Sequence, residues 1–269
     1  MPFIRRPALS EPVVCRAPRH IRLASALLAV GACLFSHICF AGPPFVTDDP
    51  EPVEKGHVQI DVAALGTVRQ GSDGATLPGV EVNYGLFDNV EIGVKLGMAY
   101  AHEVGQPGHY GFGDSELGAK YRFITEDEKS WRPQVAFSPG IALPTGNDRL
   151  GLGDGHATLL LPIWMQKSIG EWTTFGGGGY VLNRHAGQKG YWTAGWAVTR
   201  KFGEKLELGG EVFYTGAAST DDPSAFGFNV GGSYGLTESD RILFSVGRGI
   251  THVNDTNRFS YYIGYQRDL

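Results

Sequence analysis

Apolar side chains recur at every second position through most of this sequence, from residue 57 to its end. Val90, Ile92 and Val94, for example, open an apolar series that Glu91 and Gly93 interrupt regularly. Alternation of this kind over about ten residues is typical of a β-strand whose two faces meet different surroundings. No segment shows a sustained apolar stripe with the period of a helix, so we expect few helices or none.

Twelve alternating runs follow one another along the chain. They are longer than the ~5–6 residues typical of strands in soluble proteins. They match the ~9–11 residues that a tilted, membrane-spanning strand requires. No stretch is apolar for long enough to predict a membrane-spanning helix.

The connections between these runs alternate in length. Five are short, near residues 87–89, 125–130, 169–171, 203–205 and 237–240, and six are longer, near 69–76, 101–112, 143–156, 183–190, 216–224 and 251–257. Outer-membrane barrels have short turns at the periplasmic end and long loops outside. The pattern predicts an all-β fold: a single antiparallel, up-and-down transmembrane β-barrel of about twelve strands over residues 57–269.

The two faces of the strands differ in charge. The apolar and aromatic face is expected to meet lipid, because Arg or Lys at the midplane of a bilayer costs ~2–4 kcal/mol. The opposite face should line the lumen, and its predicted lining residues are Asp61, Glu81, Glu91, Lys95, Lys120, Arg122, Arg132, Glu207 and Glu211. About eight strands give a filled barrel and 16–18 an aqueous channel, so the strand number allows an open or a plugged lumen.

The N-terminal segment has the features of a secretory signal peptide. Five arginines precede the apolar run 23–35, and the small residues Ala41 and Gly42 follow it. This run is short of the ~20 residues that a membrane-spanning helix needs. We therefore expect a signal peptide over residues 1–41 and export to the outer membrane of a Gram-negative cell.

An acidic segment, residues 42–56, precedes the first strand. It contains Asp48, Asp49, Glu51 and Glu54 together with two prolines. The preferred interpretation is an extended periplasmic leader. The alternative is that the segment folds into the lumen and meets the predicted cations there, which are Lys120, Arg122 and Arg132.

Charge and cysteine content exclude several classes of function. Residues 42–269 carry 18 Lys and Arg against 27 Asp and Glu, which argues against a nucleic-acid partner. All three cysteines lie in residues 1–41, so thiolate chemistry and zinc–cysteine sites are not expected in the barrel. We predict no cofactor and no metal site.

A few acidic residues and histidines in the predicted outer loops are the candidates for a catalytic site. The candidate groups are Asp154 with His156, His252 with Asp255, and Asp221 and Asp222 with Ser219. Acids in such loops are ordinarily solvated or bind the cations that bridge lipopolysaccharide. We predict no catalytic residue, and an outer-membrane lipid hydrolase remains the less favoured alternative.

Three segments carry a family resemblance. Residues 45–50 have the sequence FVTDDP, residues 112–123 FGDSELGAKYRF, and residues 142–146 ALPTG, with GLG following at 151–153. Together they resemble the outer-membrane barrels of the meta-pathway phenol-degradation-like family over residues 45–269. The resemblance implies a channel or transporter connected with the breakdown of aromatic compounds.

These observations predict passive passage of small molecules, aromatic or apolar ones among them, through an outer-membrane barrel. Selectivity would arise from the lumen charges and from the loops 101–112 and 143–156. The expected partners are outer-membrane lipid and lipopolysaccharide, the barrel insertion machinery and a small-molecule solute. The rival interpretation from another class is a closed structural or adhesion barrel without transport.

Overall fold

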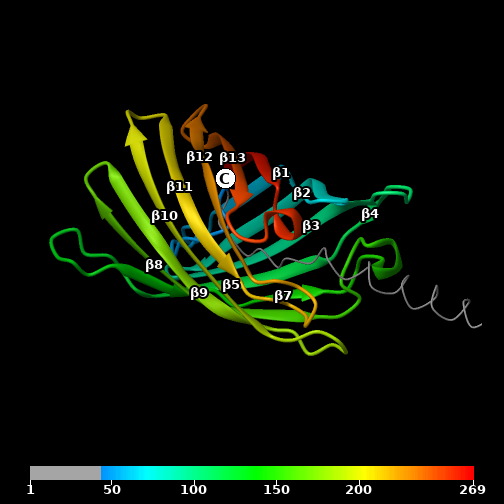
Figure 1. Cartoon of the computed structure of the whole chain (residues 1–269). Coiled ribbons are helices and arrows are strands. Elements are labelled where there is room, and N and C mark those ends of the chain that lie inside the picture. The colour runs from blue at the N-terminus through cyan, green and yellow to red at the C-terminus, as the bar shows by residue number, and fades with distance from the viewer. Residues whose placement is uncertain (1–43) are drawn as a thin grey trace, which may run out of the picture.

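The structure, a computed structural model, describes residues 44–269. Its strands form one antiparallel sheet that closes on itself, because β1 (Val58–Val68) pairs with β14 (Phe259–Asp268). Figure 1 shows the resulting barrel with its long, tilted strands. The predicted signal peptide, residues 1–41, lies outside the described residues.

The wall has twelve strand positions, although two of them are interrupted. β4 (His109–Phe112) and β5 (Ser115–Ile124) both pair with β3 (Val90–Glu103) and are halves of one membrane strand. In the same way, β6 (Gln134–Phe137) and β7 (Gly140–Leu143) share the partners β5 and β8. The predicted twelve-stranded antiparallel barrel is confirmed.

The remaining strands pair in sequence order. They are β2 (Ser72–Phe87), β8 (Thr158–Ile169), β9 (Trp172–Leu182), β10 (Tyr191–Phe202), β11 (Leu206–Thr215), β12 (Ala225–Gly235) and β13 (Asp240–Gly249). Two short helices lie in connections: η1 (Asp148–Leu150) and α2 (Val253–Thr256). Within residues 44–269, no helix is long and apolar enough to cross a membrane.

The two faces of the wall follow the alternation in the sequence. Large apolar side chains such as Ile92, Val212 and Ile263 are exposed on the outside. The charged neighbours Glu91 and Glu211 point inward and are buried. An apolar belt on the outside of a barrel is the surface that lipid covers.

The two ends of the barrel differ. The turns at 170–171 and 203–205 close one end, which we call the short-turn end, and both ends of the barrel sheet lie there, since Val58 and Leu269 exchange backbone hydrogen bonds of 3.0 and 2.8 Å. The longer loops, among them 144–157 and 216–224, lie at the opposite end, the loop end.

Three predicted connections differ in length from the expectation. The loop 101–112 is reduced to residues 104–108, because β3 and β4 extend into it, and the short connection 125–130 extends over residues 125–133. Residues 69–76 were predicted to be a long loop, but β2 begins at Ser72, and the connection contains only residues 69–71. The backbone of residues 72–76 pairs with β1 on one side and with β3, as far as Glu103, on the other. These strands extend beyond the membrane region. Only within that region does the lipid boundary require apolar and polar residues to alternate, so the alternation in the sequence does not predict the extension.

Candidate functional site

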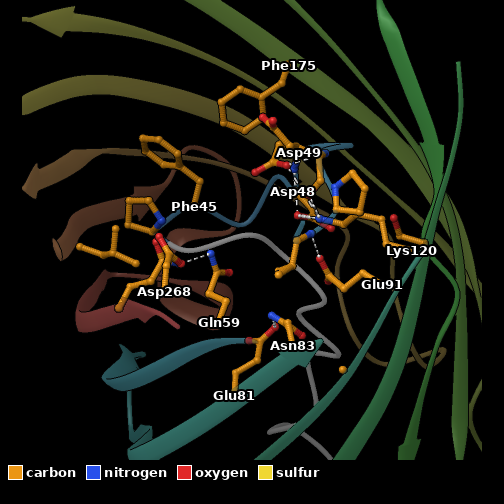
Figure 2. Close-up of a pocket in the computed structure, with 18 of the residues that line it drawn as sticks. Phe45, Asp48, Asp49, Gln59, Glu81, Asn83, Glu91, Lys120, Phe175 and Asp268 are labelled. Carbon is orange, nitrogen blue, oxygen red and sulfur yellow. Dashed lines mark hydrogen bonds and ion pairs between the residues drawn. The ribbon is translucent and has the colours of Figure 1, made fainter. Parts of the chain in front are cut away.

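The barrel interior contains a cavity of about 700 Å³ towards the short-turn end. Side chains from opposite walls line it, including Gln59 and Asp268 near the chain end and Lys120 and Phe175 across the lumen. Figure 2 shows these four side chains pointing into a common space. The cavity is therefore an interior compartment of the barrel.

Five of the nine predicted lumen residues line this cavity: Glu81, Glu91, Lys95, Lys120 and Glu207. Asp61 and Glu211 also point inward and are buried, and Asp61 stands opposite Glu81 in the strand register. The inward orientation of these seven residues agrees with the period-two pattern. Their role in a permeation path stays a prediction.

The two predicted arginines do not line this cavity, although Arg122 shares the inward face of β5 with Lys120. The Arg122 guanidinium donates hydrogen bonds to Gln134 Oε1 (3.2 Å) and to the backbone oxygen of Asp88 (3.3 Å), at the short-turn end. Arg132 lies in the connection between β5 and β6 and is exposed. Strand periodicity cannot predict the orientation of Arg132, because this residue follows the end of one strand and precedes the next.

Residues 44–56, the plug segment, run across the inside of the barrel. Phe45, Thr47, Asp48 and Pro50 are buried there, and Figure 2 shows Phe45, Asp48 and Asp49 within the cavity. The preferred interpretation as an extended periplasmic leader is wrong for this segment. The alternative, folding into the lumen, describes its position.

Glu211 on β11 holds the first part of the plug segment. Its carboxylate accepts hydrogen bonds from the amides of Val46 (2.7 Å) and Thr47 (2.8 Å) and from the Thr47 hydroxyl (2.6 Å). Asn229 Nδ2 donates a fourth, at 2.5 Å. Hydrogen bonds to a charged group each contribute ~1.5–3 kcal/mol, so neutral donors compensate the buried charge of Glu211.

Lys120 on β5 holds the middle of the plug segment. Its Nζ lies 3.2 Å from Asp48 Oδ1 and 3.8 Å from Asp49 Oδ1, and its side chain is only 11% exposed. Further along, the amide of Val53 donates to Glu91 Oε2 at 2.7 Å. The plug segment is thus fixed to opposite walls, as the dashed lines at Asp48, Lys120 and Glu91 in Figure 2 show on one side.

Two glycines on the inner wall make room for the plug segment. A Cβ atom at Gly195 would stand 2.1 Å from Thr47 Oγ1, and one at Gly85 would stand 2.0 Å from the backbone oxygen of Glu54. Atoms at such distances overlap, so any other residue at these positions would push the segment away. The plugged interior therefore requires glycine at both positions.

The inner surface has two chemically different walls. Strands β1, β2, β3, β5 and β11 contribute carboxylates and lysines, which form the charged wall. Strands β8–β10 contribute a second group, which we call the apolar wall and whose buried inward residues are Leu160, Trp164, Phe175, Val181, Tyr191 and Ala197. The same strands also place Gln166, Thr199 and Lys201 in the cavity. The ring of Phe45 lies against Phe175 and Ala197 on this apolar wall. Of the residues of the apolar wall, only Phe175 lines the cavity, so a solute there would meet mostly polar groups together with the rings of Phe45 and Phe175.

Two of the sequence motifs meet at the loop end. Asp114, between β4 and β5, accepts hydrogen bonds from the amide of Gly146 (2.8 Å) through Oδ1 and from that of Asp154 (2.7 Å) through Oδ2. Leu152, in the same loop, is buried. Burial, reinforced by the neighbouring charge of Asp114, raises the pKa of Asp154 to about 6. Asp114 thus fastens the loop 144–157 to the barrel wall.

One histidine candidate for catalysis, His156, lies in this loop. His156 Nδ1 lies 2.8 Å from the backbone oxygen of Asp154, Nε2 lies 2.8 Å from Asn183 Oδ1, and the ring stacks on His185. The side-chain carboxylate of Asp154 is therefore not the group that orients the ring, as a catalytic acid–base pair would require. Across residues 44–269, no three His, Cys, Asp or Glu side chains are grouped to hold a metal ion.

Two solved structures have a fold similar to that of this barrel. An outer membrane channel from Pseudomonas putida F1 superposes with a TM-score of 0.67 and 15% identity, over 82% of this chain and 98% of that one. The KdgM porin in complex with disordered oligogalacturonate superposes with a TM-score of 0.52 and 10% identity, over 77% and 98% of the two chains. At such identities these likenesses show the fold alone.

Sequence comparison gives the family. No curated protein matches this sequence significantly. A family model, described as "Putative MetA-pathway of phenol degradation", matches residues 41–265 and so covers the plug segment and nearly all of the barrel. The resemblance inferred from the three sequence motifs is confirmed, and the chain belongs to this family.

Proposed function

We propose that this protein is an outer-membrane channel for the passive passage of small molecules, aromatic or apolar ones among them. The observation that carries this proposal is the interior cavity of about 700 Å³, in which charged and polar side chains surround the rings of Phe45 and Phe175 (Figure 2). Pockets of this size suit small solutes. The family description, which concerns phenol degradation, and the channels with the same fold support the proposal.

The walls suggest how such a solute moves. An amphipathic molecule would pass with its apolar part against Phe175 and its polar group towards the lysines and carboxylates of the cavity. Selectivity arises from these lining groups and from the loops at the loop end. The mechanism uses neither an energy source nor a catalytic residue.

The plug segment determines how much of the lumen is open. It crosses the interior between Glu211 and Lys120, so passage requires that the solute move around it or displace it. The proposed organisation is a cleaved signal peptide, residues 1–41, which directs export, followed by the plug segment and the barrel. Outer-membrane lipid and lipopolysaccharide would cover the exposed apolar belt, and the barrel insertion machinery would place the chain in the membrane.

Ion conductance of the refolded protein in planar bilayers, at two salt concentrations and with or without phenol, tests the proposal. We expect discrete conductance steps that phenol reduces. Heat-modifiable gel mobility shows whether the protein is folded. A silent bilayer with folded protein would reject the open channel and favour a closed structural barrel.

A lipid hydrolase would instead release fatty acid from phospholipid micelles. That activity would disappear in His156→Ala and in Asp154→Asn. Detection of such turnover would replace the channel by an enzyme as the primary function.

A further inference from the structure

We propose that the position occupied by the Phe45 ring on the apolar wall is a binding site for a small aromatic solute with a hydroxyl group, which binds in competition with Phe45. This inference rests on the proposed channel function and assigns one specific binding site within it.

The wall residues that Phe45 contacts, Phe175 and Ala197, accommodate one aromatic ring. The ring centroids of Phe45 and Phe175 are 6.4 Å apart with a tilt of 49°, within the range of favourable aromatic pairs. Ala197, directly opposite Phe175 in the strand register, is 0% exposed and packs in one cluster with Phe45 and Phe175. Phe45 itself is 6% exposed. The chain's own ring therefore demonstrates that this position accepts a benzene-sized group.

Two buried hydroxyl groups belong to the same cavity. Thr199 and Ser138 are 4% and 5% exposed, and both line the cavity together with Phe45 and Phe175. Among the described residues, neither hydroxyl oxygen has a hydrogen-bond partner. Thr199 is the next inward-facing residue after Ala197 on β10. A phenylalanine ring cannot satisfy such hydroxyls, whereas an aromatic alcohol can donate or accept a hydrogen bond.

The attachment of Phe45 makes it displaceable. The ring belongs to the plug segment, which polar contacts at Glu211 and Lys120 hold on either side of the lumen. It is not part of the continuously hydrogen-bonded barrel. A solute that takes its position removes one apolar contact and weakens the neighbouring hydrogen bonds of Val46 and Thr47 to Glu211.

Binding of phenol to the folded full-length chain in detergent micelles, measured by titration calorimetry, tests the site. Phe45→Ala should bind phenol at least tenfold more tightly than wild type, because the competing ring is gone. Phe45→Ala combined with Phe175→Ala should lose this gain. Phe259→Ala, which removes an exposed ring on the outer face, is the matched control and should bind as wild type. Phe45→Leu, a smaller change, serves if the alanine variant does not fold.

The hydroxyl group is tested in the Phe45→Ala background. Adding Thr199→Val should weaken phenol about tenfold and leave toluene unchanged, because toluene has no hydroxyl group. Equal effects on both ligands, or no effect on either, would reject recognition of the hydroxyl at Thr199.

Competition is tested in the wild-type chain by hydrogen exchange. Phenol should accelerate exchange of the Val46 and Thr47 amides in wild type and leave it unchanged in Phe45→Ala. Unaltered exchange in wild type, or no gain in affinity for either Phe45 variant, would overturn the proposal. Conductance without phenol binding would retain the channel and reject this site. Phenol binding in a silent barrel would retain the site and reject the channel.

Discussion

Glu211 accepts hydrogen bonds from both the amide and the hydroxyl of Thr47, at 2.8 and 2.6 Å, although 164 residues separate the two in sequence. This relationship ties the plug segment to the barrel wall. It also gives a lumen carboxylate a structural role, because its oxygens are occupied by the chain itself. Specific contacts therefore hold the plug segment inside the barrel, and single substitutions can remove them one at a time.

Replacing Glu211 with alanine should release the first part of the plug segment. Each hydrogen bond to a charged group contributes ~1.5–3 kcal/mol, so the variant should unfold at lower temperature. Its single-channel conductance should rise severalfold over wild type. Glu207→Ala, on the same strand and face, is the control and should leave the plug segment in place. A wild-type conductance in Glu211→Ala would contradict the anchoring role.

Replacing Lys120 with methionine should leave Asp48 buried without its cation. Breaking a buried ion pair by removing one partner costs ~3–5 kcal/mol, and the loss should show as a lower midpoint in heat-modifiability gels. Adding Asp48→Asn should recover most of the stability, because no charge then remains unpaired at that position. Asp49→Asn, whose carboxylate is farther from Lys120 Nζ, at 3.8 Å, is the control and should rescue less. Equal rescue by both second substitutions would argue against a specific pair.

Replacing Gly195 with alanine should displace Thr47, because the added Cβ would stand 2.1 Å from the Thr47 hydroxyl oxygen. Overpacking of this kind typically costs ~1–3 kcal/mol. We expect lower stability and a larger conductance. Thr47→Ala in the same chain removes the clashing atom and should restore part of the stability. If Gly195→Ala behaves as wild type in both measurements, Thr47 does not occupy this position in the membrane.

The loop 144–157 should respond to pH through Asp154. Burial raises the pKa of this carboxyl from its ordinary 3.8 to about 6 in the folded loop. The folded loop therefore favours the protonated form. The resulting stability is fully present below about pH 3.8 and is lost as pH rises through about 6.

Hydrogen exchange of the loop amides between pH 4 and 7, corrected for the intrinsic exchange rate, measures this effect. Protection in wild type should fall as pH rises, and Asp154→Asn should remove that component. The difference between the two proteins isolates Asp154 from the nearby His156. Identical pH profiles in wild type and Asp154→Asn would show that Asp154 does not control the loop.

Strand number and the orientation of most lumen residues could be predicted from the sequence. Side chains alternate across a strand for local, backbone reasons, so Glu81, Glu91 and Lys120 had to share the inward face once the strands were recognised. The apolar wall was harder to predict from the sequence than the charged lumen residues. Leu160 and Trp164 disturb the alternation of β8, and they do so because they point inward and are buried.

The end of a strand was less predictable than its middle. Residues 72–76 lack a marked apolar alternation, which favours a loop, yet their backbone completes the pairing of β1, β2 and β3. The hydrogen bonds that form there depend on the neighbouring strands. These hydrogen bonds cannot be predicted from the sequence of residues 72–76 alone.

The sequence by itself determined the architecture of this protein: a period of two, repeated in twelve runs, permits a barrel with one apolar and one charged face. Tertiary structure alone decided how the interior is filled. The placement of the plug segment depends on Glu211, Lys120 and Gly195, which lie about 70 to 165 residues away from it in sequence. Periodicity is a property of adjacent residues, whereas these contacts exist only after the barrel has closed and brought distant strands around a common lumen.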